Sequence, residues 1–333
     1  MLTRVKMLRL LASDPLADPT DMDLVEAQQL ASRGAVIVRL ADAMRSYGEE
    51  LPPQFAAAAA RACAATQCKL AIVDRLTERC ARLGLAHAFL GVAERYPDSA
   101  SLTLLVDSPW SLEVDRAVLQ TLPSRGAKPR RPGARFERRL AGSTTYVAAY
   151  GIELRLRHGR IGRFGEQARF ARLLLQRARV RPVGPTTCAS ASPEDYFLML
   201  VTERTYMRPS AHVADFAWAV SALRAPDFDW DYVFATALSL GVSAGAATYL
   251  GYLLALYRVV SDGRRGDLVP PAIRERFGVV AEPAAAPYPP TNVLARSLVE
   301  NFRATLAAGR WESAARLTML PVVAAFAGMD RAS

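Results

Sequence analysis

Two short apolar runs, at residues 85–90 and 102–106, constrain the fold of this chain more than any other feature. Each run is five or six residues long and is bounded by Gly, Pro, Asp or Ser. Runs of this length between turn residues are typical of buried strands, whereas a helix normally extends over ten residues or more. We therefore expect two neighbouring strands joined by a short, turn-rich connection.

The sequence on both sides of this strand pair has helical periodicity. Apolar residues recur at helical spacing through residues 21–84, and a long amphipathic helix is predicted from Gln54 to Leu83. After Ser192, a predicted N-cap that precedes Pro193, the chain again has a helical pattern. The helices expected there span residues 193–206, 211–223, 230–240, 242–260, 292–308 and 311–325, with a Pro- and Ala-rich linker at 282–290.

Between these helical regions the pattern changes to a period of two. Ile152, Leu154 and Leu156 alternate with charged residues, which predicts a half-buried strand over 152–157. Two further strands are predicted at 135–140 and 144–150, and helices at 112–122 and 165–180, the first of them with Ser111 as a possible N-cap. The sequence thus predicts an α+β protein with a small mixed sheet between helical regions. The expected divisions are 1–84, 85–185, 186–281 and 282–333.

The 333-residue chain has a formal net charge of +10 and a pI of about 9.8, which favours anionic partners such as nucleotides. Most Arg residues are scattered, however, so solvated helix faces explain much of the charge. The one basic cluster, at residues 123–135, has no interleaved aromatic residues for stacking on bases, so it gives no specific nucleic-acid signal. We expect a solvated loop there rather than a phosphate-binding one.

The chain has four Cys residues without a Cys-x-x-Cys pair and only three His residues, so we expect neither a zinc site nor a disulfide framework. Residues 1–11 lack the pattern of a signal peptide, and the cytoplasm is the default location. The uncharged segment 234–257 is long enough to span a bilayer, but Gly241 should divide it into two packed helices. No membrane span is expected.

The order of these elements resembles that of bacterial nucleotidyltransferase-like proteins of the polymerase-β-like superfamily. The resemblance covers roughly residues 20–260. It rests on Phe89-Leu90-Gly91, on Tyr96-Pro97, on the strand Ser101–Val106, on a later strand with Glu153 and Arg155, and on the segments that begin at Ser192, Asp215 and Asp229. It implies a nucleotidyltransferase-like core with helical flanks.

In that family, two Asp residues on one strand bind Mg²⁺, which contacts the nucleotide phosphates, and a neighbouring strand supplies a third carboxylate. Here Ser101 and Thr103 occupy the positions of the two Asp residues, and Glu153 stands near the third. Neutral hydroxyls are weak ligands for a hard dication. The resemblance therefore implies a degenerate active site in which Gly91, Ser101, Thr103 and Arg155 contact a nucleotide.

The main hypothesis is a non-catalytic protein that binds a nucleotide, a peptide or a protein partner in the former active-site cleft. One alternative is an active Mg²⁺-dependent transferase with relocated carboxylates, in which Asp107 and Glu153 hold one metal ion. Another alternative is an unrelated helical scaffold. Structural or surface roles are expected for the three His residues, His87, His158 and His212.

Overall fold

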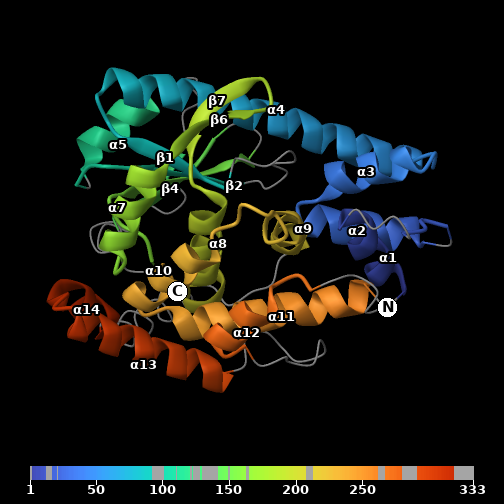
Figure 1. Cartoon of the computed structure of the whole chain (residues 1–333). Helices are drawn as coiled ribbons and strands as arrows, with labels where there is room; N and C mark the ends of the chain where they lie inside the picture. The colour runs from blue at the N-terminus through green and yellow to red at the C-terminus, as the bar shows by residue number, and fades with distance from the viewer. Residues whose placement is uncertain are drawn as a thin grey trace, which may run out of the picture.

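The computed structural model describes residues 2–12, 17–20, 22–91, 101–109, 111–120, 122, 128–129, 142–148, 151–162, 165–207, 213–261, 267–279 and 291–318. These residues build a mixed sheet with helices on both faces and helical regions at one end and below (Figure 1). The predicted α+β class is confirmed. The expected strand at 135–140 and the Tyr96-Pro97 turn lie outside the described residues, as do His212 and most of the basic cluster.

Seven strands form the sheet in the order β3-β4-β5-β2-β1-β7-β6 within the described part of the chain. β1 pairs antiparallel with β2 and parallel with β7, and β2 pairs parallel with β5. The prediction of one mixed sheet with strands in 85–90, 101–106 and 144–157 is confirmed for the described residues, which exclude 149–150. The strands are β1 (His87–Leu90), β2 (Ser101–Val106), β3 (Lys128–Pro129), β4 (Ser143–Val147), β5 (Glu153–His158), β6 (Arg179–Val183) and β7 (Thr186–Ser190).

One face of the sheet packs under α4 (Pro53–Arg82) and α5 (Leu112–Leu119). Alternate strand residues such as Phe89, Leu104 and Leu156 point to this face and are fully buried against Leu76 and Val118. In Figure 1, α4 runs along the top of the molecule above the strands. The helix predicted at 54–83 therefore exists with nearly those bounds and covers this core.

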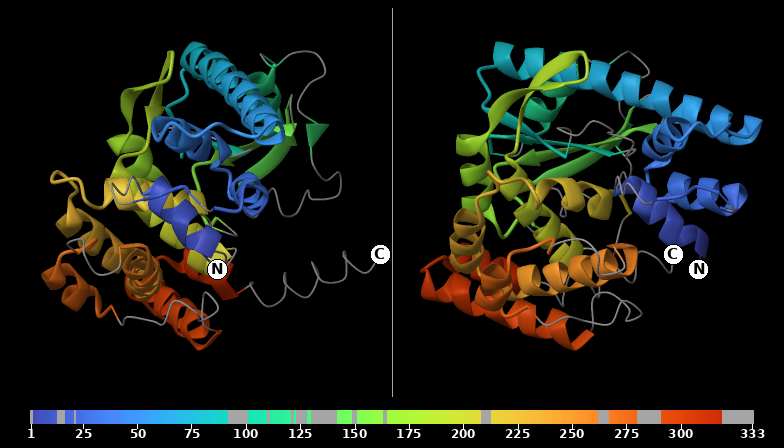
Figure 2. Two further views of the ribbon diagram at one scale, coloured as in Figure 1. Left: turned by 90° about the vertical axis from the view of Figure 1, so that its right-hand side faces the viewer. Right: turned by 45° about the vertical axis from the view of Figure 1, so that its right-hand side comes forward.

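The opposite face carries the C-terminal helices. Leu90 and Leu105 belong to a second core with Phe170 of α7 (Ala168–Arg177) and Phe197 of α8 (Pro193–Val201). The remaining helices of this region follow α8, and the last of them in the chain lie at the bottom of the molecule in the second view of Figure 2. They are η2, a π-helix (Thr202–Met207), α9 (Val213–Ala222), α10 (Trp230–Leu240), α11 (Ser243–Ser261), α12 (Pro271–Phe277), α13 (Thr291–Ala307) and α14 (Trp311–Thr318).

The N-terminal helices form a third core at the end of α4. They are α1 (Leu2–Leu11), α2 (Leu24–Arg33) and α3 (Ile37–Ser46), and α1 was not expected from the sequence. Met7, Leu40 and Phe55 are buried there against Ala217 of α9. Arg9 of α1 donates a hydrogen bond from Nε to the carbonyl of Val260 in α11, 2.8 Å away. Both ends of the described chain are thus held to the same helical region.

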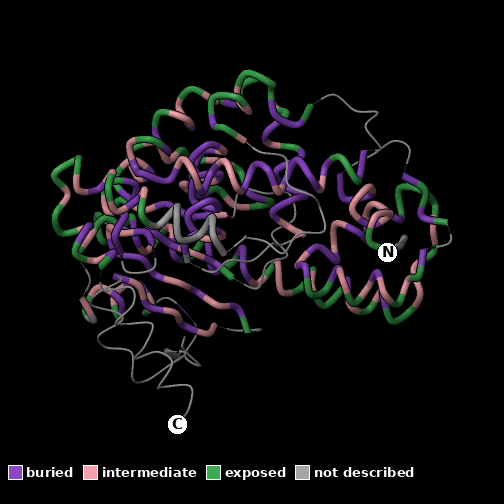
Figure 3. The backbone as a smooth tube through the Cα atoms, turned by 90° about the horizontal axis from the view of Figure 1, so that it is seen from below, coloured by how far each residue is buried: buried purple, intermediate pink, exposed green. Residues whose placement is uncertain are grey.

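The uncharged segment is divided as predicted. Gly241 ends α10 in the left-handed conformation (φ 71°), and α11 begins two residues later. A Cβ at Gly241 would lie 2.6 Å from the Cβ of Ala304 in α13, so the turn also needs Gly for close packing. No helix among the described residues is long and apolar enough to cross a membrane. Figure 3 shows buried positions gathered in the interior and exposed ones along the outer turns.

Two predictions about the middle of the chain need correction. The helix expected over 165–180 ends at Arg177, and residues 179–190 form an antiparallel hairpin, β6–β7, that the sequence analysis did not predict. The expected division after residue 185 falls in the turn of this hairpin, so the sheet continues past it. In the basic loop predicted at 123–135, Lys128 and Pro129 form a short strand against β4.

Candidate anion-binding site

An arginine-lined cavity lies where the end of α7 and the strand β6 meet the start of α8. Its volume is about 300 Å³. Arg177 comes from the last turn of α7, and Arg179 and Arg181 follow on β6. The cavity is lined by Arg177, Arg179, Arg181, Ser192, Pro193, Glu194, Ala222, Ala225, Asp227 and Phe228.

A narrower cavity of about 80 Å³ adjoins the first, since Arg181 and Pro193 line both. Its walls come from the ends of β1 and β7 and from α8 and α9. The lining residues are Phe89, Gly91, Arg181, Ser190, Ala191, Pro193, Tyr196 and Trp218. The rings of Tyr196 and Trp218 pack edge to face with centroids 4.7 Å apart, which gives the narrow cavity a rigid wall.

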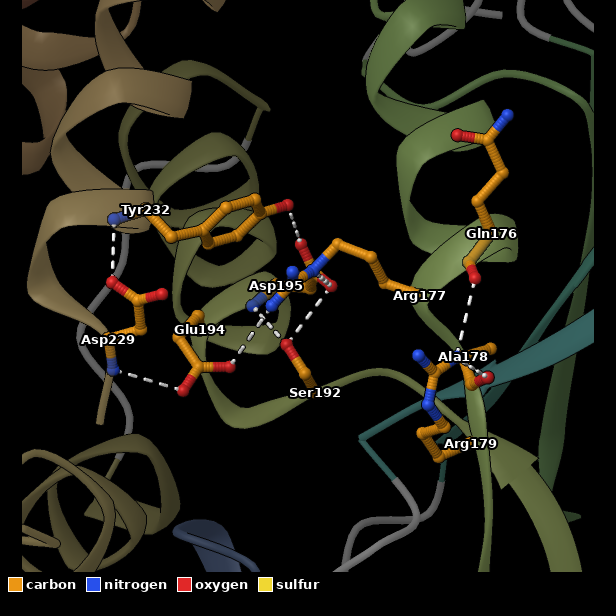
Figure 4. A network of polar contacts seen from close by, with 9 residues as sticks. All are labelled: Gln176, Arg177, Ala178, Arg179, Ser192, Glu194, Asp195, Asp229 and Tyr232. Carbon is orange, nitrogen blue, oxygen red and sulfur yellow. Dashed lines mark hydrogen bonds and ion pairs between the residues drawn. The ribbon is translucent and has the colours of Figure 1, made fainter. Parts of the chain in front are cut away.

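Arg177 is fixed by acidic and aromatic partners (Figure 4). Its Nε lies 3.1 Å from Oδ2 of Asp195, an Nη lies 3.8 Å from Oε2 of Glu194, and its Cζ lies 3.7 Å above the Tyr232 ring. Burial lowers the pKa of Arg177, but Asp195 and the other acidic neighbours raise it more, so the net shift is upward. Arg177 therefore carries a positive charge that Asp195 and Glu194 already offset.

Asp195 is the centre of this network. It is fully buried, and it accepts hydrogen bonds from Tyr232 Oη at 2.5 Å and from Ser192 Oγ at 3.0 Å (Figure 4). Burial raises the pKa of Asp195 above its usual range, more than the hydrogen bonds and Arg177 lower it. Ser192 also accepts from the Asp195 amide, so the predicted N-cap of α8 is confirmed.

Arg179 and Arg181 differ from Arg177, because no described carboxylate forms an ion pair with either side chain. Arg179 donates only to the carbonyls of Gln176 and Ala178, at 3.4 and 3.2 Å. Cross-strand pairing sets Arg179 opposite Ser190 and Arg181 opposite Cys188, so both side chains project to the same face of the hairpin. Two guanidinium groups with unused donors are a typical receptor for phosphate or carboxylate.

Ser190 adds a polar atom to the narrow cavity. Its side chain is 1% exposed, and its Oγ has no hydrogen-bond partner among the described residues. A buried hydroxyl without a partner is destabilising by roughly 1–3 kcal/mol, so it is expected to be satisfied by something bound. Arg181 and Ser190 therefore both line the narrow cavity, and each has side-chain hydrogen-bonding groups without a partner among the described residues.

Gly91 is the one predicted binding residue that lines this cavity. It follows β1 with φ 79°, a conformation that favours Gly. A Cβ there would lie 3.0 Å from the ring of Tyr196. Gly91 thus leaves room for Tyr196 at the wall of the narrow cavity.

Four of the other predicted site residues lie together on β2 and β5. Ser101 is opposite Glu153, and Thr103 is opposite Arg155. Ser101 is exposed, while Thr103, Glu153 and Arg155 are partly buried. Because directly opposite residues share a face, the structure brings these four side chains onto one side of the sheet.

This β2–β5 face contains a carboxylate that the sequence did not reveal. Glu203 of η2 places Oε1 3.1 Å from Nη2 of Arg157 and 3.6 Å from Nη1 of Arg155. The Arg157 side chain is buried, and burial lowers its pKa more than Glu203 raises it. Glu203 thus offsets positive charge that would otherwise attract an anionic ligand to this face. A charged residue after the apolar run 197–201 was the only available signal.

Asp107 and Glu153 are not brought together. Glu153 begins β5 opposite Ser101, whereas Asp107 follows the end of β2, beyond the pair Val106–His158. Asp107 lies six residues beyond Ser101, and at roughly 3.3 Å per residue this places it about 20 Å along the strand direction from Glu153. One metal ion cannot bridge them, so the relocated pair does not fit. No group of three or more His, Cys, Asp or Glu residues in the described part of the chain could hold a metal.

A second buried polar network joins α5 to the sheet. His158 Nε2 lies 2.7 Å from Asp115 Oδ1, Ser108 Oγ lies 3.1 Å from His158 Nδ1, and Tyr146 donates to Asp115. The order Ser–His–Asp resembles a nucleophile relay. The imidazole is fully buried among these partners, and the network connects α5 to β4 and β5.

No protein-family model, curated protein or solved structure shows significant similarity to the chain. The functional argument therefore depends on the geometry and charge of the cavities themselves.

Proposed function

We propose that this chain binds a small phosphate-bearing ligand, such as a nucleotide, without a metal ion and without transferring any group. The observation that carries the proposal is the pair Arg179 and Arg181, which lines the larger cavity and has no described carboxylate partner. Guanidinium groups form two parallel hydrogen bonds to phosphate oxygens. A cavity of about 300 Å³ suits a ligand no larger than a mononucleotide.

The proposed scaffold is a nucleotidyltransferase-like core that has lost its catalytic carboxylates. The cross-strand register supports this proposal, because Glu153 lies opposite Ser101, next to where the family's metal-binding pair stands. With Ser101 and Thr103 at those two positions, too little negative charge remains to hold two Mg²⁺ ions. The proposed ligand site therefore moves from the β2–β5 face to the neighbouring arginine cavity, with Gly91 in its narrow extension.

Calorimetry with AMP, ATP and inorganic phosphate, each in Mg²⁺ and in EDTA, tests the proposal. Binding should be unchanged by EDTA. The variant Arg181→Gln should weaken it about 10- to 100-fold, which corresponds to one charge-assisted bidentate contact of roughly 1.5–3 kcal/mol.

The matched control is Arg45→Gln on α3, which removes the same charge from an exposed side chain in the N-terminal helical core that lines neither cavity. It should leave the affinity within about twofold, since distant exposed charges are screened by salt. Equal losses in both variants, or binding that requires Mg²⁺, would contradict the proposal.

A further inference from the structure

We infer that the ligand is recognised through a phosphorylated sugar, with the phosphate on Arg179 and Arg181 and the sugar hydroxyls in the narrow cavity. This inference rests on the proposed function and specifies its ligand class. It starts from two observations that are independent of one another. Arg181 lines both cavities, and the buried Oγ of Ser190 has no described partner in the narrow one.

The phosphate belongs in the larger cavity because the arginines gather there. Three guanidinium groups line it, and only Arg177 among them is neutralised by described carboxylates. Two carboxylates also line the cavity. Glu194 is engaged with Arg177 and with the amide of Asp229, at 3.3 Å, whereas Asp227 is exposed at the surface. The positive charge that remains lies on β6.

The narrow cavity suits a neutral group that can form hydrogen bonds. Phe89, Tyr196 and Trp218 supply aromatic surface to it, while Arg181 and the buried Ser190 supply polar groups. A second phosphate would lose its hydration there and gain only Arg181, whereas a sugar presents C–H faces to the rings and hydroxyls to Ser190. The narrow cavity has about 80 Å³, against about 300 Å³ for its neighbour. A nucleobase is therefore expected to remain outside it.

Two consequences distinguish this arrangement from binding of a bare phosphate. Ribose 5-phosphate should bind at least tenfold more tightly than inorganic phosphate, and AMP should bind within about threefold of ribose 5-phosphate. Occupation of the narrow cavity should also change the fluorescence of Trp218, which lines it and is 8% exposed. Inorganic phosphate should leave that fluorescence unchanged.

The deciding experiment is calorimetry and fluorescence titration of the full chain with ribose 5-phosphate, inorganic phosphate and ribose. Ser190→Ala should weaken the binding of ribose 5-phosphate about three- to tenfold, which corresponds to the loss of one hydrogen bond, and should leave the binding of inorganic phosphate unchanged. Thr187→Ala, on the same strand but exposed, is the matched control and should affect neither ligand. Trp218→Phe should abolish the fluorescence response while phosphate still binds.

The outcomes separate this inference from the proposed function. Suppose that phosphate binds and that Arg181→Gln abolishes this binding, but that ribose 5-phosphate binds no more tightly than phosphate. The sugar assignment is then wrong and the anion site stands. The same holds if Ser190→Ala weakens both ligands equally. If none of the three ligands binds, both proposals fall. If Ser190→Ala does not fold, Ser190→Cys keeps the size of the side chain with a weaker hydrogen-bonding group and should give the same selective loss.

Discussion

Oε1 of Glu203 lies 3.1 Å from Nη2 of Arg157, and this ion pair connects the π-helix η2 to the sheet. The Arg157 side chain is only 1% exposed, and Glu203 is the acidic neighbour that raises its pKa most, ahead of Glu166. Glu203→Gln should lower the free energy of unfolding by about 2–4 kcal/mol. Urea unfolding followed by circular dichroism measures this loss.

The control for this prediction is an ion pair at the surface. Glu78 pairs with Arg82 one turn away on α4, and both side chains are more than half exposed. Glu78→Gln should change stability by less than about 1 kcal/mol, because solvent screens the pair. A loss in Glu203→Gln no larger than this would show that the buried pair contributes little.

The electrostatic sign of the arginine cavity can be tested at Asp227. This exposed carboxylate lines the cavity with Arg179 and Arg181 and opposes an anionic ligand. Asp227→Asn should therefore tighten phosphate binding about two- to fivefold at low salt, with less effect at high salt, because screening weakens the repulsion. Glu275→Gln, an exposed change of equal charge on α12, should have no effect on calorimetric affinity. Weaker phosphate binding in Asp227→Asn would mean that the anion lies elsewhere.

Asp195 should make stability depend on pH in a defined direction. Burial raises its pKa in the folded state, so the folded chain holds this proton more tightly than the unfolded chain does. Its contribution to the free energy of unfolding should then fall as pH rises from the unfolded-state pKa of about 3.9 through the higher folded-state pKa. Denaturation of the wild type and of Asp195→Asn at a series of pH values gives the contribution as a difference.

A second variant checks the cause of this shift. Tyr232→Phe removes a hydrogen bond that lowers the pKa of Asp195, so the pKa should rise further. Carboxyl-carbon NMR titration of Asp195 measures it directly. A difference in stability that grows with rising pH in this window, or a lower pKa in Tyr232→Phe, would contradict the assignment of burial as the dominant effect.

Three of the four thiols should differ in reactivity according to their burial. Burial raises the pKa of Cys80 to about 12 and that of Cys188 to about 11, and both side chains lie in the core under α4. Cys63 is exposed on the same helix. A disulfide reagent at pH 8 should therefore modify Cys63 in the folded chain and reach Cys80 and Cys188 only in denaturant. Rapid labelling that persists in Cys63→Ser and maps to Cys80 would contradict this packing.

The β2–β5 face should not support Mg²⁺-dependent chemistry. Ser101 and Thr103 supply no negative charge, and the neighbouring Arg155 is held by Glu203. Incubation with labelled nucleoside triphosphates and a panel of acceptors should give no transfer above background. Robust transfer that is lost in Glu153→Gln would instead establish an active enzyme.

Local signals in the sequence predicted much of the fold. The alternation at residues 152–157, the cap at Ser192 and the break at Gly241 each depend on a few adjacent residues, and each appears in the structure as expected. The hairpin β6–β7 was missed because Arg179 and Arg181 interrupt its apolar pattern. The Gly184-Pro185 pair between its strands was the available turn signal.

The candidate site was less predictable because it is assembled from distant segments. Gly91 was named from the family resemblance, through the match at Phe89-Leu90-Gly91, but Ser190 reaches the same cavity only through the parallel pairing of β1 with β7. Similarly, Glu203 meets Arg157 across 46 positions of sequence. Such contacts depend on the order of strands and on helix packing, neither of which a periodic pattern specifies.

The hydrogen bond from Arg9 to Val260 joins residues that are 251 positions apart. On the ribosome, at roughly 5–20 residues per second, the first helix would wait for about 13–50 s before its partner is synthesised. The sheet has the same dependence, since β1 needs β7 to complete its pairing. Native packing of the N-terminal helices should therefore be completed late in synthesis or after release, when chaperones that bind nascent apolar segments would have their longest access to this chain.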